Sequence, residues 1–316
     1  MSNGLSDTIG NSATTPVYGE AIGRGVVDRV GGMADRVLVT LDGEVRDADA
    51  PLLHADDFGV LRGDGVFETL LVRGGKARAV ELHLARLASS ASAADLPAPE
   101  LDDWRLAIDL AVEQWGDERE GALRLVYTRG REVGNEPTAF LLVTPVAERV
   151  ETARRDGVSV VSLERGYSVD LAQKAPWQLL GAKTLSYSTN MAALRHAESV
   201  GADDVIYTSS EGHVLEGPRS TVVIARGRTL FTTPPELGIL PGTTQQALFD
   251  AAGEHDFTVR YEALRPADLI VADGVWLLSS VALAARVHTL DGHSLATEAL
   301  DGEIEKLVDK AIDAAR

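Results

Sequence analysis

The side chain with the clearest chemical potential is that of Lys183, which lies among small and apolar residues in the segment 180–185 (LGAKTL). Partial burial would lower the pKa of its ammonium group, because the charged form loses solvation, and would make the amine a usable nucleophile. Taken alone, a lysine at a predicted strand–helix junction is more often structural than catalytic. Other charged or reactive groups must decide between the two interpretations.

A carboxylate of interest, Glu216, lies in the segment 212–221 (GHVLEGPRST), after a short predicted strand and before a Gly-Pro turn. A carboxylate held in a cleft can keep a pyridine nitrogen protonated and so make an aromatic ring an electron sink for carbanions. The alternative is an acidic turn residue that faces solvent, and by itself this alternative is favoured.

Two further segments carry groups that bind phosphate. In the segment 240–245 (LPGTTQ), Thr243 and Thr244 follow a glycine at a predicted helix start, where free N–H groups, hydroxyls and the positive end of the helix dipole attract anions. In the segment 83–87 (HLARL), the helical pattern turns two leucines toward the core and leaves Arg86 free to reach a phosphate with its planar guanidinium. Ordinary threonine capping and a surface arginine are the alternatives here.

The composition of the 316-residue chain narrows the classes of function. Hydrophobic residues make up 45% and charged residues 25%, as in ordinary globular proteins. The formal net charge of −18 disfavours nucleic-acid binding, because phosphate backbones would be repelled. The absence of cysteine excludes disulfides, iron–sulfur clusters, thiolate zinc sites and cysteine nucleophiles, and we predict no metal. No apolar run approaches the ~20 residues of a membrane span, and no signal-peptide pattern opens the chain, so we expect a cytoplasmic enzyme.

The elements that must position these groups divide the chain into three parts. Residues 1–32 are rich in Gly, Ser and Thr and are predicted to be a flexible extension, with Met33 as an alternative start; an extension that packs on the body stays open. Residues 33–150 are predicted to form a small α/β domain and residues 151–316 a larger one, with a charged, patternless boundary at 147–156. The fold class is mixed, α+β or α/β, in two domains.

Hydrophobic periodicity predicts the individual elements. In the first domain, strands are predicted at 37–40, 66–72, 77–80, 123–128 and 139–144, and helices at 81–93 and 101–115. In the second, strands are predicted at 158–163, 204–208, 221–225 and 229–231 and near Val259 and Val275, and helices at 185–200, from 241 to about 252 and at 303–315. Lys183 therefore precedes one helix, and Thr243 and Thr244 open another.

Six ordered segments resemble those of one enzyme family. They are 63–69 (GDGVFET), 83–87 (HLARL), 127–130 (YTRG), 182–183 (AK), 216–217 (EG) and 240–244 (LPGTT). Over residues 37–290 the chain resembles the fold-type IV, class IV aminotransferase-like pyridoxal-phosphate enzymes. This family includes branched-chain aminotransferases, D-amino-acid aminotransferases and aminodeoxychorismate lyases. The resemblance implies an α+β, two-domain fold like that of D-amino-acid aminotransferase.

By that resemblance the cofactor is pyridoxal 5'-phosphate, with Lys183 as its Schiff-base lysine and Glu216 as the partner of its pyridine nitrogen. The resemblance places four residues at or near the phosphate: Arg86, Thr243, Thr244 and Ser280. It places Tyr187 near the cofactor's phenolic oxygen, and the substrate-side candidates are Phe67, Thr69, Arg129 and Arg131. Residues 151–316 would be the cofactor-binding domain, and homodimers that share residues at the site are usual in the family.

Family members remove a proton with the lysine as acid and base and then diverge. An aminotransferase returns the proton to the cofactor, whereas aminodeoxychorismate lyase expels pyruvate and releases 4-aminobenzoate for folate biosynthesis. The segment 128–135 (TRGREVGN) lacks the Arg-x-His pair of D-amino-acid aminotransferases, and Phe67-Glu68-Thr69 replaces the Phe-Glu-Gly of branched-chain enzymes. Gln245 and Thr221 also depart from common family residues.

These motifs favour an aminodeoxychorismate lyase as the first prediction. A branched-chain or D-amino-acid aminotransferase of the same fold is the alternative, because both chemistries use the same core groups. A non-catalytic binding protein descended from the fold is a remote third reading, and the joint presence of Lys183, Glu216, Arg86 and Thr244 argues against it.

Overall fold

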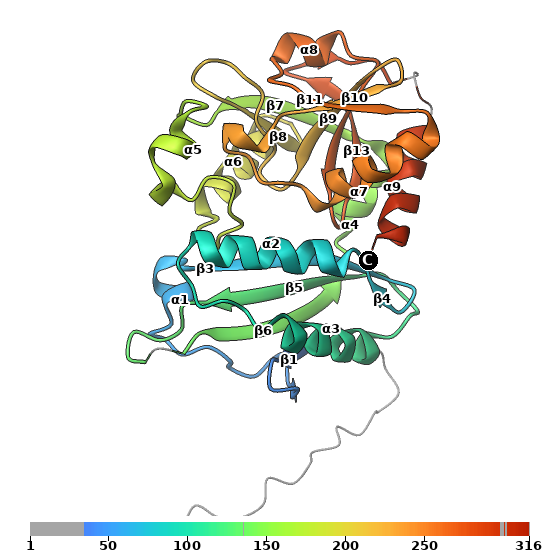
Figure 1. Ribbon diagram of the computed structural model, residues 1–316. Coiled ribbons are helices and arrows are strands. Elements are labelled where there is room, and N and C mark those ends of the chain that lie inside the picture. The colour runs from blue at the N-terminus through green and yellow to red at the C-terminus, as the bar shows by residue number, and fades with distance from the viewer. Residues whose placement is uncertain (1–34, 135, 298–299, 301, 316) are drawn as a thin grey trace, which may run out of the picture. The chain divides into compact units, whose positions relative to one another are not determined.

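The first sheet has six antiparallel strands in the order β2-β1-β6-β5-β3-β4 (Figure 1). The computed structural model describes residues 35–134, 136–297, 300 and 302–315. The predicted extension 1–32 and the alternative start at Met33 lie outside the described residues. The elements of this half are β1 (Val37–Thr40), β2 (Val45–Arg46), α1 (Phe58–Arg62), β3 (Gly65–Arg73), β4 (Lys76–Ala77), α2 (Val80–Ala93), α3 (Leu101–Trp115), β5 (Gly121–Thr128) and β6 (Thr138–Pro145).

Alternation along β3 explains how this sheet carries its helices. Val66, Leu70 and Val72 are fully buried on one face, where they share a core with Leu84 of α2 and Trp104 of α3. Side chains of a strand point alternately to its two faces, so residue 68 belongs to the same buried face and residues 67 and 69 to the other. The two substrate-side candidates on β3, Phe67 and Thr69, therefore lie on the second face.

The second sheet is mixed and has the strand order β11-β10-β9-β12-β13-β7-β8, with β14 paired to β13. Its strands are β7 (Val158–Glu164), β8 (Asp204–Thr208), β9 (Thr221–Arg226), β10 (Thr229–Thr232), β11 (Thr258–Tyr261), β12 (Gly274–Ser279), β13 (Leu283–Leu290) and β14 (His293–Ser294). The helices are α4 (Glu148–Asp156), α5 (Leu171–Lys174), α6 (Ser188–Ser199), α7 (Thr243–Ala252), α8 (Pro266–Ile270) and α9 (Glu303–Ala314). The predicted α+β class is therefore confirmed. No helix of the described part is long and apolar enough to cross a bilayer.

The two sheets belong to one compact unit that runs from residue 34 to residue 316. Leu71 of β3 and Ala79 share a hydrophobic core with Trp276 of β12 and Leu307 of α9, so the apolar contacts do not stop at either sheet. Arg154 of α4 donates to the Oε2 atom of Glu120 at 2.7 Å, which adds a polar link. The division into domains at about residue 150 stays a proposal.

Three local predictions need correction. The patternless boundary at 147–156 contains α4, in which six of the nine residues are charged and Val150 alone is buried. The predicted strand 77–80 ends at Ala77, because Ala79 adopts a positive φ of 52° and α2 begins at Val80. The predicted helix 185–200 begins only at Ser188, because the residues before it pair with a strand. β13 was not predicted at all.

Candidate active site

Lys183 is held in place by the backbone of the first sheet. Its carbonyl accepts a hydrogen bond from the Phe67 N–H at 3.0 Å, and the Leu185 N–H donates to the Gly65 carbonyl at 2.8 Å. Its own N–H donates to Ser90 Oγ at 3.1 Å. Residues 183–185 thus pair with residues 65–67 of β3 in the first sheet, although they lie between β7 and β8 of the second sheet in the sequence.

The electrostatic surroundings of Lys183 favour the neutral amine. Burial, and after it the nearby Arg86 guanidinium, lowers the pKa of Lys183 to about 8 against the opposing pull of Glu68 and Glu216. Its Nζ atom lies 4.5 Å from the centre of the Phe67 ring. An amine with this pKa is nucleophilic and can also carry a proton near neutral pH.

Phe67 and Tyr187 line the lysine's side of β3. Their rings meet edge to face, with centres 5.4 Å apart and planes at 86°. The Tyr187 hydroxyl donates to the Pro218 carbonyl, which also accepts from Asn190 Nδ2 at 3.1 Å. Burial raises the pKa of Tyr187 to about 12, so the phenol keeps its proton. Tyr187 lies just before α6, and its hydroxyl ties it to the loop that follows Glu216.

Glu216 is fixed by two donors. Its Oε1 atom accepts from Arg165 Nη1 at 2.5 Å, and its Oε2 atom accepts from the Leu240 N–H at 2.9 Å. Arg165 lies 5.2 Å from the ring centres of both Tyr167 and Tyr207. Burial would lower the pKa of Arg165, but Glu216 and the tyrosines outweigh it, and the net pKa is raised. No local pattern distinguishes Arg165 from the other lysines and arginines of the chain, 30 in all, and it was not predicted.

The start of α7 is built to receive an anion. Gly242 is its N-cap residue, and a Cβ atom there would lie 2.2 Å from Thr221 Oγ1, so only glycine fits. Thr244 is 2% exposed, and its hydroxyl has no hydrogen-bond partner among the described residues. A buried, unpaired hydroxyl beside free N–H groups on the first turn of a helix matches the needs of a phosphate group.

Arg86 of α2 brings a positive charge to the start of α7. Its Nη1 atom donates to the Pro241 carbonyl at 2.8 Å, which places the guanidinium beside the start of α7. Its Nε and Nη2 atoms both donate to the Glu68 carboxylate at 2.7 Å. The surface interpretation of Arg86 is therefore wrong, because its side chain is only 11% exposed.

Glu68 and His83 are buried site residues that the sequence prediction did not single out. Burial would raise the pKa of Glu68, but Arg86 and His83 outweigh it and hold that pKa well below its usual range. Burial lowers the pKa of His83, with Glu68 opposing. One signal could have revealed Glu68: it interrupts the apolar face of β3 formed by Val66, Leu70 and Val72.

The remaining substrate-side candidates lie in other surroundings. Thr69 is half-buried on the same face of β3 as Phe67. Arg129 donates to Asp64 Oδ2 at 2.6 Å and to the carbonyls of Ala94 and Asp95 at the end of α2. The Nε atom of Arg131 donates to both carboxylate oxygens of Asp56, at 3.0 and 3.1 Å, in an exposed ion pair. The structure thus brings Phe67 to Lys183 and engages both arginines in ion pairs.

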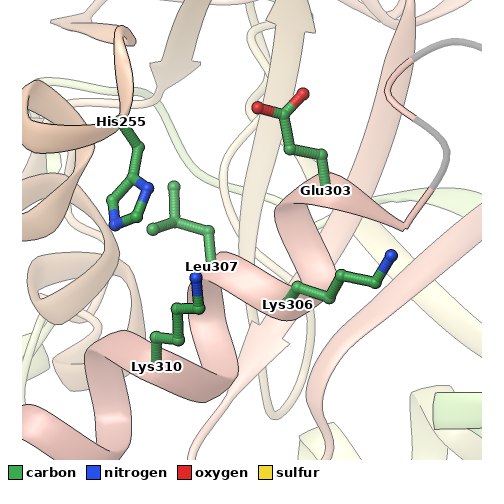
Figure 2. Close-up of a pocket in the computed structure, with 5 residues that line it drawn as sticks. All are labelled: His255, Glu303, Lys306, Leu307 and Lys310. Atoms are coloured by element: carbon green, nitrogen blue, oxygen red, sulfur yellow. The ribbon is translucent and has the colours of Figure 1, made fainter.

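A pocket of about 220 Å³ between α9 and the turn after α7 is a separate feature (Figure 2). It is lined by His255, Glu303, Lys306, Leu307 and Lys310, and none of these is a predicted site residue. In Figure 2 the two lysines point in different directions, and the carboxylate of Glu303 already pairs with Arg228 at 2.8 Å. This pocket is therefore separate from the predicted site residues.

Residues 65–290 match the family model described as amino-transferase class IV. The chain belongs to this family. The predicted membership of the fold-type IV family is confirmed, and the chain is an enzyme with the fold of that family. A relative from Mycobacterium tuberculosis, named as a bifunctional aminodeoxychorismate lyase / D-amino acid transaminase, is 54% identical over 285 residues, which are 87% of this chain and 99% of the relative.

Solved structures agree with the class IV assignment. A hypothetical aminotransferase from Mycobacterium tuberculosis in a PLP-bound form superposes with a TM-score of 0.87 at 54% identity, over 89% of this chain and all (100%) of the other. A form with α-ketoglutarate and PMP bound has the same TM-score of 0.87. A fold IV transaminase from Curtobacterium pusillum is 38% identical with a TM-score of 0.83, over 88% of this chain and 98% of the other.

Proposed function

We propose that this enzyme uses pyridoxal phosphate to convert 4-amino-4-deoxychorismate into 4-aminobenzoate and pyruvate. The observation that carries the proposal is the buried Lys183 amine, with a pKa of about 8, beside the Phe67 ring. The relative that is 54% identical bears the name of this lyase, which supports the same choice of substrate.

The described residues fit the cofactor at both ends. Arg86, Thr243, Thr244 and Ser280 would hold the phosphate, and Glu216 would face the ring nitrogen, held in place by Arg165. When bound, the cofactor supplies an electron-withdrawing ring that stabilises a carbanion at the substrate carbon. Lys183 would bind the cofactor covalently, take the substrate proton at its Nζ atom and return it. Tyr187 would orient the ring oxygen, with Phe67, Thr69, Arg129 and Arg131 as substrate-side candidates.

Transamination of D-amino acids is the second candidate activity. It is supported by the bifunctional name of the relative and by the α-ketoglutarate-bound form of the similar structure. Both activities begin with the same proton transfer to Lys183, so one site can serve both. The proposal also includes a cytoplasmic homodimer that acts in folate biosynthesis.

One assay distinguishes these activities. Purified enzyme is supplied with 4-amino-4-deoxychorismate, and 4-aminobenzoate and pyruvate are measured; parallel reactions contain D-alanine, D-glutamate or L-leucine with a 2-oxo acid. We expect 4-aminobenzoate from the wild type and none from the Lys183→Ala variant. Vigorous transamination without any 4-aminobenzoate would reject the lyase. Light scattering of the same preparation measures the subunit number.

A further inference from the structure

Two hydroxyl groups from separate elements meet at one nitrogen of His83. The Nε2 atom of His83 lies 3.1 Å from Ser280 Oγ and 3.3 Å from Thr243 Oγ1. These two oxygens are themselves 3.3 Å apart. Ser280 follows β12 and Thr243 opens α7, so His83 of α2 fixes the spacing of two groups that the second sheet presents.

The other nitrogen of His83 is held by Glu68. The Nδ1 atom lies 2.7 Å from Glu68 Oε2, and the two side chains are 1% and 0% exposed. An ionised carboxylate only accepts hydrogen bonds, so Nδ1 carries a hydrogen. In a neutral ring the Nε2 atom then has a free lone pair and accepts a hydroxyl hydrogen. Three charged groups face this ring from the elements around it: Glu68, Arg86 and Lys183.

The same carboxylate also orients Arg86. Both the Nε and the Nη2 atoms of Arg86 donate to Glu68, and its Nη1 atom remains directed at the start of α7. Every side chain proposed to hold the phosphate, except Thr244, therefore connects to Glu68 directly or through His83. Because Nε2 accepts from one hydroxyl at a time, the other hydroxyl of the pair is left to donate to a phosphate oxygen.

We propose that Glu68 and His83 are positioning residues for the phosphate end of the cofactor, and that they act through the hydroxyls of Thr243 and Ser280. This inference rests on the proposed function in one respect, namely that a phosphate-bearing pyridine cofactor occupies the site. A purely structural role, in which His83 only neutralises a buried carboxylate, is the competing explanation.

Two conservative variants separate these explanations. In His83→Asn the amide nitrogen takes the place of Nδ1, so the contact with Glu68 survives and the reach to the two hydroxyls is lost. In His83→Gln the amide takes the place of Nε2, so the hydroxyls keep a partner and the contact with Glu68 is lost. The positioning role predicts that Asn is the more harmful change for phosphate binding, whereas the structural role predicts that Gln is.

The experiment measures binding of pyridoxamine phosphate and of pyridoxamine to the apoprotein by calorimetry. Neither ligand forms the covalent link, and the dissociation constant of pyridoxamine divided by that of pyridoxamine phosphate isolates the phosphate contribution. We expect His83→Asn to reduce this ratio by about tenfold or more, since hydrogen bonds to a charged group are lost, and His83→Gln to reduce it less. Thr232→Val, which removes a buried hydrogen bond to the Val222 carbonyl away from the site, is the matched control and should leave the ratio unchanged.

Each possible result has a consequence. An unchanged ratio in His83→Asn, or equal weakening of both ligands, would overturn the positioning role while leaving the proposed function intact. A wild type that does not prefer the phosphate-bearing ligand would overturn both. If His83→Asn does not fold, nitrogen NMR of the wild-type histidines gives the answer: the Nε2 signal, assigned with His83→Gln, should move on adding pyridoxamine phosphate and not on adding pyridoxamine. If neither ligand changes the chemical shift of this Nε2 signal, the inference is rejected.

Discussion

The Nζ atom of Lys183 lies 4.5 Å from the centre of the Phe67 ring, and the two residues are also joined by a backbone hydrogen bond of 3.0 Å. The ring face attracts a cation, yet burial and Arg86 act more strongly in the other direction and bring the pKa of Lys183 to about 8. The pairing with β3 therefore fixes the position of the amine, whereas burial and Arg86 set its protonation.

The first prediction concerns pH. Because the lysine pKa is lowered to about 8, half of the amine is neutral at that pH, so the rate at which the apoprotein reacts covalently with pyridoxal should reach half its maximum near pH 8 and level off above it. Arg86→Gln should move this midpoint upward, since it removes a neighbouring positive charge. Pyridoxal lacks a phosphate, so the loss of a phosphate contact does not confuse the result. A rate that keeps rising to pH 10 in the wild type would contradict the assignment.

Removing the amine should abolish the chemistry. Lys183→Ala is expected to lose the visible absorbance of the covalently bound cofactor and to lower turnover by about 10⁴-fold or more, as for other nucleophile deletions. Lys174→Ala is the control, because Lys174 is 70% exposed and pairs only with Asp170 across one helical turn. Normal turnover in Lys183→Ala, measured by release of 4-aminobenzoate, would refute the mechanism.

Glu216 is expected to act on turnover more than on binding. In Glu216→Gln the amide oxygen can still accept from Arg165, but the negative charge that would hold a proton on the ring nitrogen is lost. We expect kcat to fall on the order of a hundredfold, the usual effect of removing one electrostatic stabiliser. The dissociation constant for pyridoxamine phosphate should change little. A large loss of cofactor affinity with unchanged kcat would show that Glu216 has a binding role instead.

Arg129 offers a test that separates stability from substrate binding. Arg129→Ala removes contacts with Asp64 and with two carbonyls at the end of α2, and because both charged side chains are 35% exposed we expect a loss of about 1–2 kcal/mol in the free energy of unfolding. Urea denaturation of the apoprotein measures it. Arg155→Ala, which removes an exposed pair with its neighbour Asp156, should change that free energy by less than about 0.5 kcal/mol. Unchanged stability with a raised KM would favour substrate binding by Arg129.

The sequence predicted the elements with strong periodicity and missed those defined by partners. The helix at residues 101–115 was predicted with the bounds of α3, because its apolar residues recur at helical spacing and Trp104 and Ile108 are buried. The helix α4 was missed because eight of the nine positions, all but Val150, face solvent or lie at the edge of the core. The start of α6 was placed too early because pairing of residues 183–185 with β3 is a long-range contact that no local pattern reveals.

The candidate site followed the same rule. Lys183, Glu216 and Thr244 were predicted through motifs, since glycine and small residues mark the close approaches around them. Arg165, Glu68 and His83 were not, because what makes them important is a buried partner far away in sequence: 51 residues separate Arg165 from Glu216, and 15 separate His83 from Glu68.

The pairing of residues 183–185 with β3 also bears on how relatives of this enzyme can be recombined. A chimera with a crossover anywhere between α4 and Lys183 would take the lysine from one parent and the strand that aligns it from the other. Such an exchange mixes two backbones at the position where the amine must be placed most accurately. Point substitutions on the half-buried face of β3, at positions such as Thr69, leave this pairing intact, so laboratory evolution of substrate choice has more freedom there than in the shuffling of entire halves.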